Sequence, residues 1–263
     1  LANLCRQAEV IVAVDSEVNA RELNEAAVRY DSLLPVVIEV NIGMDRAGVL
    51  PGEPSVKLAT ILHELEGLRF MGVMGWEGHA RRFQDPGERK SVCEESVGKL
   101  VATAELCRSR GLPVQIVSCG GTGTHEYSSH VSGVTELQAG GIIFNDMYYA
   151  RVGVEHEFAL TVVSTVVSRP HPRRIITDAG KKTMSSDAAE PKPLGVGKVE
   201  ALSFSAEHGT ILTVEDSAVE IGDRVQWIVG YSDTTVALHD ELYAVRDERV
   251  EVVWPILGRG KLR

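Results

Sequence analysis

The sequence predicts an α/β fold, a partial (β/α)8 TIM-type barrel followed by a predominantly β C-terminal domain. Up to about residue 150, short Val/Ile-rich runs alternate with amphipathic segments, which is typical of βα units around a parallel sheet. The apolar runs are nearly continuous, as in strands buried on both faces. An open doubly wound sheet is the alternative architecture for this half.

The first domain is expected to span residues 1–155 and to alternate strands with helices. Ser16 is suited to cap the first helix, because its hydroxyl oxygen can accept a hydrogen bond from an N–H of the first turn. The expected strands are Val10–Val14, Pro35–Val40, Phe70–Met74, Val114–Val117 and Val134–Leu137, and the expected helices are Ser16–Tyr30, Ser55–Leu65 and Glu88–Arg110.

The second domain, residues 156–263, is expected to be mostly β, because helical periodicity largely disappears and turn residues separate short apolar runs. Ser185–Gly197 is rich in Ser, Ala, Pro and Gly and is expected to be a surface loop. The expected strands are Thr161–Val167, Arg174–Thr177, Thr210–Val214, Arg224–Val229, Glu241–Val245 and Val250–Trp254.

Composition excludes several classes of function. The 263 residues have 44% hydrophobic content, enough for a sizeable core, and no apolar run approaches the ~20 residues of a membrane span. The net charge of -10, without a basic patch, argues against nucleic acid as a partner. The four cysteines form no C-x-x-C pair, which favours a reduced, cytoplasmic setting.

The first residues, Leu1–Arg6, contain no initiator Met and no signal-peptide pattern, and they resemble the middle of a helix. We therefore expect the sequence to be a fragment of a longer protein whose N-terminal part is missing.

Residues capable of chemistry gather where the expected strands of the first domain end. In a parallel barrel these strand ends share one face, where such enzymes place their active sites. The four segments are Asn41–Gly48, Gly75–His79, Ser118–Thr124 and Gln138–Gly141.

The third segment contains the loop Gly120-Gly-Thr-Gly-Thr124. Its glycines allow backbone N–H groups to converge and its threonine hydroxyls add donors, which suits an anionic oxygen cluster such as phosphate. The loop lacks the lysine of a P-loop and the spacing of a dinucleotide fingerprint. The alternative is a glycine-rich turn without a ligand.

The other segments add Arg46, Trp76, His79 and Gly140-Gly141. Each has a purely structural alternative: a surface ion pair of Arg46 with Asp45 or Glu39, packing of Trp76, a structural histidine and a tight turn. Together they suit an aromatic cofactor with a phosphate tail, of which pyridoxal phosphate is one.

These motifs resemble the D-threonine aldolase / D-serine dehydratase family, the alanine-racemase-like branch of pyridoxal phosphate enzymes. The resemblance covers nearly the whole chain. It is carried by Glu39–Gly48, Trp76–His79, Gly120–Thr124, Glu136–Gly140, Asp178–Gly180, Lys182, Glu207–Gly209, Leu238–Asp240, Trp254–Ile256 and Arg259-Gly260.

The resemblance implies a pyridoxal 5′-phosphate barrel with a β domain, usually dimeric, acting on D-3-hydroxy amino acids. It implies that Arg46 lies near the cofactor's phenolic oxygen, that His79 lies close to the ring and that Gln138 lies near the pyridine nitrogen. It also implies a cofactor site that includes Trp76, with Gly121, Thr122, Gly123, Thr124, Gly140 and Gly141 holding the phosphate.

The chain departs from the family pattern in two places. The lysine that binds the cofactor covalently belongs to an N-terminal segment that the chain does not contain, and Lys181 and Lys182 match a different motif. We therefore expect the chain as given to be inactive. The family's metal-binding Gly-His-x-Asp stretch reads Gly230-Tyr-Ser-Asp233 here, which leaves Asp233 as the one evident ligand.

A divalent metal, Mn or Zn, is therefore doubtful, because one carboxylate makes a poor site. Tyr231 is expected either to act as an acid/base in place of the metal or to pack. His239, a candidate substitute ligand, belongs to a separate family motif.

The leading prediction is a pyridoxal phosphate lyase, an aldolase or a dehydratase, whose small-molecule substrate is a D-3-hydroxy amino acid. Its alternatives are an amino-acid racemase or epimerase, which needs no metal, and a non-catalytic pyridoxal phosphate-binding protein. A homodimer is expected, without nucleic acid or membrane.

Overall fold

The computed structural model describes residues 1–261 and confirms the predicted fold class. Its contacts divide the chain into two compact units, Leu1–Gly140 and the residues from Gly141 onward. The domain boundary predicted after residue 155 falls inside the second unit. The last two residues of the predicted second domain, 262 and 263, lie outside the described part of the chain.

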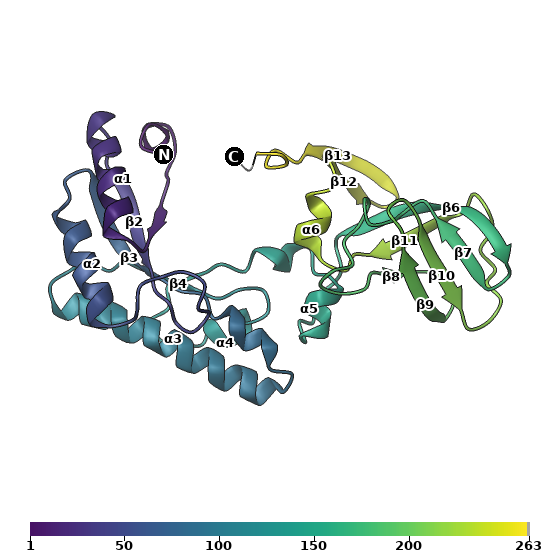
Figure 1. Cartoon of the computed structure of the whole chain (residues 1–263), viewed down its shortest axis with the longest axis horizontal. Coiled ribbons are helices and arrows are strands. Elements are labelled where there is room, and N and C mark those ends of the chain that lie inside the picture. The colour runs from purple at the N-terminus through teal and green to yellow at the C-terminus, as the bar shows by residue number, and fades with distance from the viewer. Residues whose placement is uncertain (262–263) are drawn as a thin grey trace. The chain divides into compact units, whose positions relative to one another are not determined.

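The first unit is built on a five-stranded, wholly parallel sheet in the order β1-β2-β3-β4-β5 (Figure 1). This order follows the sequence, as in a stretch of a (β/α)8 barrel, rather than reversing as in a doubly wound sheet. The strands are β1 (Val12–Val14), β2 (Leu34–Glu39), β3 (Leu68–Met74), β4 (Ile116–Cys119) and β5 (Glu136–Leu137).

Three helices, α1 (Glu17–Arg29), α2 (Glu53–Glu64) and α3 (Pro86–Ser109), pack on one face of this sheet. Ser16 is the N-cap of α1, as predicted, but its side chain makes no capping hydrogen bond. The start of the chain forms a short 3-10 helix, η1 (Leu4–Arg6), instead of the middle of an α-helix. The remaining short elements are η2 (Gly78–Arg82), α4 (His125–Ser128) and η3 (Gly140–Ile143).

The core of the first unit lies between the sheet and these helices. Val36 and Ile38 of β2, Leu62 of α2 and Leu100 of α3 are completely buried there. Because β2, β3 and β4 run parallel, the loops that follow them emerge at the same edge of the sheet.

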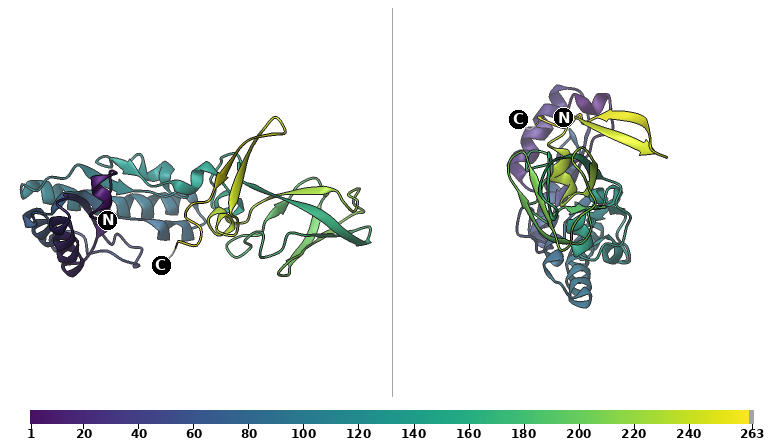
Figure 2. Two further views of the ribbon diagram at one scale, coloured as in Figure 1. Left: turned by 90° about the horizontal axis from the view of Figure 1, so that it is seen from above. Right: turned by 90° about the vertical axis from the view of Figure 1, so that its right-hand side faces the viewer.

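The second unit contains a six-stranded antiparallel sheet in the order β8-β11-β6-β7-β10-β9. A separate hairpin, β12–β13, projects away from this sheet (Figure 2). The strands are β6 (Thr161–His171), β7 (Arg174–Thr177), β8 (Lys192–Pro193), β9 (Val199–Phe204), β10 (Gly209–Thr213), β11 (Arg224–Ile228), β12 (Glu241–Arg246) and β13 (Arg249–Pro255), and the helices are α5 (Met147–Arg151) and α6 (Ser232–Val236).

This unit has its own core around Trp227, whose buried indole Nε1 donates a hydrogen bond to Ser164 Oγ at 2.8 Å. Strands β8 and β9 were not predicted from the sequence, and Lys192–Pro193 was expected to lie in a loop. Both strands are at the edges of the sheet. No helix in the described part of the chain is both long and apolar enough to cross a membrane.

Candidate active site

The loop that follows β2 is shaped by the side chain of Asn41. Asn41 Oδ1 accepts hydrogen bonds from the N–H groups of Gly43 at 3.0 Å and Asp45 at 3.2 Å, and its Nδ2 donates to Asp45 Oδ1 at 2.9 Å. Gly48 closes the loop with φ +105°, and a Cβ there would lie 2.6 Å from the Asn41 nitrogen, so glycine is required. Arg46 therefore extends from a loop of defined shape.

Arg46 makes two contacts. Its guanidinium carbon lies 5.0 Å from the centroid of the Trp76 ring, and one of its nitrogens lies 3.7 Å from Glu39. The ion pair with Glu39 was the structural alternative considered for Arg46, and it is long and half exposed. Pairs of this kind contribute little, so the guanidinium keeps donors for an anion.

Trp76 connects the loop after β2 to the predicted phosphate loop, Gly120–Thr124, which is also called the glycine loop. Its ring is contacted by Arg81, whose guanidinium carbon lies 4.9 Å from the centroid. A Cβ added to Gly121 would lie 2.7 Å from the indole Nε1, and one added to Gly78 would lie 2.5 Å from the ring. Glycine at these two positions lets the indole lie directly against the backbone of the predicted phosphate loop.

Some donors and acceptors of the predicted phosphate loop hydrogen-bond to one another. Gly120 has φ +80°, and the Gly121 N–H donates to Thr124 Oγ1 at 3.1 Å. By contrast, Thr122 Oγ1 is buried and has no partner. Within residues 1–261 the N–H groups of Thr122 and Gly123 also donate no hydrogen bond. An unpartnered buried hydroxyl is costly, and a bound anion would satisfy it.

Glu77 organises this loop, a role that was not predicted from the sequence. Its side chain is completely buried, and it accepts hydrogen bonds from Thr124 Oγ1 at 2.6 Å, Ser128 Oγ at 2.5 Å and the Gly120 N–H at 3.2 Å. Cys93 Sγ approaches it at 3.9 Å. The available signal was a carboxylate in the short segment that follows the largely buried strand β3.

His79 is held by α3 and by the β2 loop. Its Nε2 lies 3.2 Å from Ser96 Oγ, and its ring packs against Gly43, where a Cβ would lie 2.8 Å away. Its Nδ1 is buried without a partner. Burial, together with the nearby Arg82 charge, lowers the pKa of His79 below its usual value. The imidazole is therefore neutral at pH 7 and presents a free Nδ1.

Gln138 lies beside the strand that leads into the glycine loop. Its Nε2 donates to Ser118 Oγ at 2.7 Å, and Ser118 donates to Glu136 at 2.5 Å. These polar side chains line a cavity of about 200 Å³ together with apolar residues that include Val37 and Met74. The Gly140 N–H donates to the Gln138 carbonyl at 2.9 Å, which forms a turn there.

Of the predicted residues of the first unit, Trp76 lies against the glycine loop and Gln138 bonds to the strand before it. Arg46 reaches this loop only through Trp76, and His79 contacts Gly43 of the loop after β2 and Ser96 of α3. Gly141 begins the second unit, where its carbonyl accepts the N–H groups of Phe144 and Asn145.

Tyr231 and Asp233 belong to the second unit. The Tyr231 hydroxyl donates to Asp233 Oδ2 at 2.6 Å, and its ring packs edge-on against Tyr148. Burial, followed by the hydrogen bond with Asp233, raises the pKa of Tyr231 well above its usual value. Tyr231 therefore keeps its proton at neutral pH, and its hydroxyl donates that proton's hydrogen bond to Asp233.

The predicted metal ligand Asp233 is exposed and already bonded to Tyr231. His239, the candidate substitute, has its Nε2 2.7 Å from the Thr183 carbonyl. Within residues 1–261 no group of three or more His, Cys, Asp and Glu side chains is arranged to hold a metal ion.

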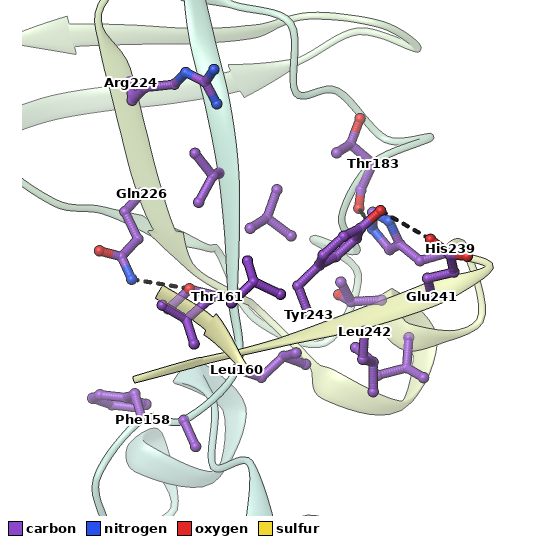
Figure 3. A pocket seen from close by; sticks show the side chains of 17 residues that line it. Phe158, Leu160, Thr161, Thr183, Arg224, Gln226, His239, Glu241, Leu242 and Tyr243 are labelled. Atoms are coloured by element: carbon purple, nitrogen blue, oxygen red, sulfur yellow. Dashed lines mark hydrogen bonds between the residues drawn. The ribbon is translucent and has the colours of Figure 1, made fainter. Parts of the chain in front are cut away.

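A larger cavity of about 740 Å³ lies in the second unit, between β6, β11 and the β12–β13 hairpin (Figure 3). Three of its polar side chains bond to neighbours: Gln226 to Thr161 at 3.0 Å, Tyr243 to Glu241 at 2.9 Å and His239 to the Thr183 carbonyl at 2.7 Å. The lining combines apolar and polar side chains, and this cavity was not predicted from the sequence.

Comparison with known families matches both halves of the chain. Residues 1–147 match the family described as "Alanine racemase, N-terminal domain", and residues 159–245 match the "Putative serine dehydratase domain". A D-threonine aldolase of Arthrobacter sp. is 32% identical over 99% of this chain and 70% of its own length.

Two solved structures are also similar. The D-threonine aldolase of Filomicrobium marinum superimposes with a TM-score of 0.92 at 31% identity, covering 100% of this chain and 73% of that one. The D-threo-3-hydroxyaspartate dehydratase of Delftia sp. HT23 superimposes with a TM-score of 0.81 at 26% identity, covering 96% of this chain and 73% of that one. With its first half matched to the racemase domain and nearly its whole length to an aldolase, this chain belongs to the alanine-racemase-like, fold type III family of pyridoxal phosphate enzymes, which includes the D-threonine aldolases.

Proposed function

We propose that this chain binds pyridoxal 5′-phosphate and acts as a lyase on a D-3-hydroxy amino acid, of the D-threonine aldolase or D-serine dehydratase type. The observation that carries the proposal is the buried, unpartnered Thr122 hydroxyl inside a glycine loop against Trp76. Pyridoxal phosphate is typical of the family, and the similar proteins include two aldolases and a dehydratase.

The residues present fit the phosphate of this cofactor. The Thr122 hydroxyl and the N–H groups of Thr122 and Gly123 provide neutral donors, which suit a phosphate because its oxygens are strong acceptors. Thr124 stabilises the loop instead of providing a donor for the ligand, because its hydroxyl donates a hydrogen bond to Glu77. Gly140 and Gly141 remain predicted phosphate contacts.

When bound, pyridoxal phosphate supplies an electron sink for the electron pair left at the substrate Cα. Arg46 would bind an anionic oxygen of the cofactor or substrate, and Trp76 would cover the site and exclude water. The Nδ1 of neutral His79 would take up or return a proton, a role supported by its lack of a partner while Nε2 is engaged by Ser96. Gln138 would offer a neutral amide to the cofactor's ring nitrogen.

The assay uses the natural full-length protein with pyridoxal phosphate and a panel of D-3-hydroxy amino acids. Cleavage of the Cα–Cβ bond releases glycine and an aldehyde, whereas loss of the β-hydroxyl as water leads to a 2-oxo acid and ammonia. We expect one of these product pairs, and we expect Arg46→Ala and His79→Gln to reduce kcat/KM at least tenfold.

The products also distinguish the alternatives. Formation of only the amino acid inverted at Cα would show a racemase or epimerase instead. Cofactor binding without any product from the whole panel would show a binding protein and would overturn the lyase proposal.

We also propose that the reaction depends weakly or not at all on a divalent metal. This rests on the donor set: Tyr231 stands at the family's histidine position and engages Asp233. At this position the protonated Tyr231 hydroxyl would then hold the Asp233 carboxylate in place of a metal ion. Strong inhibition by a chelator, restored by Mn²⁺ or Zn²⁺, would contradict this, and Asp233→Asn identifies whether Asp233 is the ligand.

The cytoplasmic setting and the homodimer also remain proposals. The four cysteines are free thiols, which supports a reducing compartment. Sedimentation of the natural protein tests for the dimer.

A further inference from the structure

Glu77 is an unusual residue for an anion-binding site, because it brings a carboxylate to the loop where a phosphate is expected. Its side chain has no exposed surface. Its Oε1 accepts hydrogen bonds from Thr124 at 2.6 Å and Ser128 at 2.5 Å, while its Oε2 accepts the Gly120 N–H at 3.2 Å. Both oxygens are therefore engaged by the loop and by the short helix α4 that follows it.

The donors come from segments that are distant in sequence. Glu77 follows β3, Gly120 begins the loop after β4, and Ser128 ends α4. Cys93 of α3 adds a thiol 3.9 Å away, and burial raises the pKa of this thiol to about 12, so it stays protonated at neutral pH. One side chain thus ties the ends of two neighbouring strands to the helix layer.

These bonds decide which donors of the loop remain for a ligand. Thr124 Oγ1 donates to Glu77 and accepts the Gly121 N–H at 3.1 Å, so neither group is left over. The Gly120 N–H is used as well. The groups left without a partner are the Thr122 hydroxyl and the N–H groups of Thr122 and Gly123, all at the centre of the loop.

We infer that Glu77 is a positioning residue of the phosphate loop: it holds Gly120, Thr124 and Ser128 so that the Thr122 and Gly123 donors face the anion. It does not touch the ligand in this role. The inference rests on the proposed function, because it concerns the same loop and the same phosphate.

The substitution Glu77→Gln distinguishes a positioning role of Glu77 from a purely electrostatic one, because the two roles change phosphate affinity in opposite directions. Glu77→Gln removes a negative charge near a phosphate, which by charge alone would tighten binding. It also replaces an oxygen that accepts hydrogen bonds with an NH₂ group that donates them, so it faces the donors of the loop with another donor. If Glu77 acts by positioning, the second effect dominates and phosphate binding weakens.

The experiment compares pyridoxal phosphate, inorganic phosphate and pyridoxal, which lacks the phosphate, as ligands of the natural full-length protein. We expect Glu77→Gln to weaken the affinity for both phosphate-bearing ligands at least tenfold and that for pyridoxal less than twofold. The matched control is Thr103→Val, a buried hydrogen-bonded side chain between α2 and α3. It should leave all three affinities within about twofold.

A second variant covers the case in which Glu77→Gln does not fold. Ser128→Ala keeps the carboxylate and removes one of its donors, and we expect about threefold weaker binding of pyridoxal phosphate with unchanged binding of pyridoxal. Equal losses for pyridoxal and pyridoxal phosphate, or tighter phosphate binding, overturn the positioning role alone. A wild-type protein that binds neither phosphate-bearing ligand overturns the proposed function together with this inference.

Discussion

At the scale of single residues, the predicted phosphate loop divides into groups that the fold uses and groups that it leaves free. From the sequence, the hydroxyls of Thr122 and Thr124 are equally good candidates for binding a ligand. In the structure Thr124 donates to the buried Glu77, whereas Thr122 has no partner. The two residues should therefore respond in opposite ways to the same substitution.

We expect Thr122→Val to raise the free energy of unfolding by about 1 kcal/mol, because it removes a buried hydroxyl that lacks a partner. The same change should weaken pyridoxal phosphate binding several-fold. Thr124→Val is the matched control and should lower stability by about 1–2 kcal/mol, since it leaves Glu77 short of a donor. Denaturant unfolding and ligand titration measure both; a destabilised Thr122→Val would contradict the prediction.

His79 gives a prediction about pH. Its pKa is lower in the folded state than its usual value of 6.5, so below that value the unfolded chain takes up a proton that the folded protein resists. His79 therefore reduces stability as the pH falls through 6.5, and the loss stops once the folded-state pKa is passed. His79→Gln should flatten this part of the stability profile.

The control for that profile is His63→Gln on the exposed side of α2, which should leave it unchanged. An NMR titration of the His79 ring checks the pKa directly. A midpoint at or above 6.5 would show that burial does not dominate at this site.

At the scale of elements, sequence periodicity located the long helices and the central strands well. The helix expected at Glu88–Arg110 is observed at Pro86–Ser109, and the strand expected at Pro35–Val40 is observed at Leu34–Glu39. Both are long or fully buried, so their apolar pattern is strong. The edge strand β9 was missed because its residues are largely exposed and give no such pattern.

Glycines within elements and loops give a paired prediction. Gly98 lies inside α3, and a Cβ there would meet nothing within 4 Å. Gly98→Ala should therefore stabilise the protein by about 0.8–1 kcal/mol, through the better helix propensity of alanine. A thermal melt measures the gain, and an unchanged or lower Tm would contradict it.

Gly121→Ala should behave in the opposite way, because its Cβ would lie 2.7 Å from Trp76 Nε1. The indole must shift, so we expect a changed Trp fluorescence spectrum and weaker pyridoxal phosphate binding. A spectrum and an affinity equal to those of the wild type would show that Trp76 does not lie against the loop.

At the scale of the whole molecule, the chain has separate cores in its two units. The core of the first unit has no members in common with the core around Trp227. Independent cores commonly unfold in separate transitions. The long helices α1, α2 and α3 all belong to the first unit, so far-UV circular dichroism at the helix band reports mainly on it.

A variant with Trp76→Phe and Trp254→Phe leaves Trp227 as the single fluorescent tryptophan, in the core of the second unit. We expect its fluorescence midpoint in denaturant to differ from the circular dichroism midpoint. Coincident midpoints at all protein concentrations would show one cooperative unit instead.

The sequence by itself determined the fold class, the two kinds of domain and the four strand-end segments, because alternation of apolar runs and glycine-rich loops is a local property. The family resemblance in the same motifs was confirmed by the matched families. Only the tertiary structure decided how the segments bond to one another. The engagement of Thr124 and Gly120 by Glu77, and of His79 by Ser96, joins residues far apart in the chain, and spacing along a sequence does not encode such contacts.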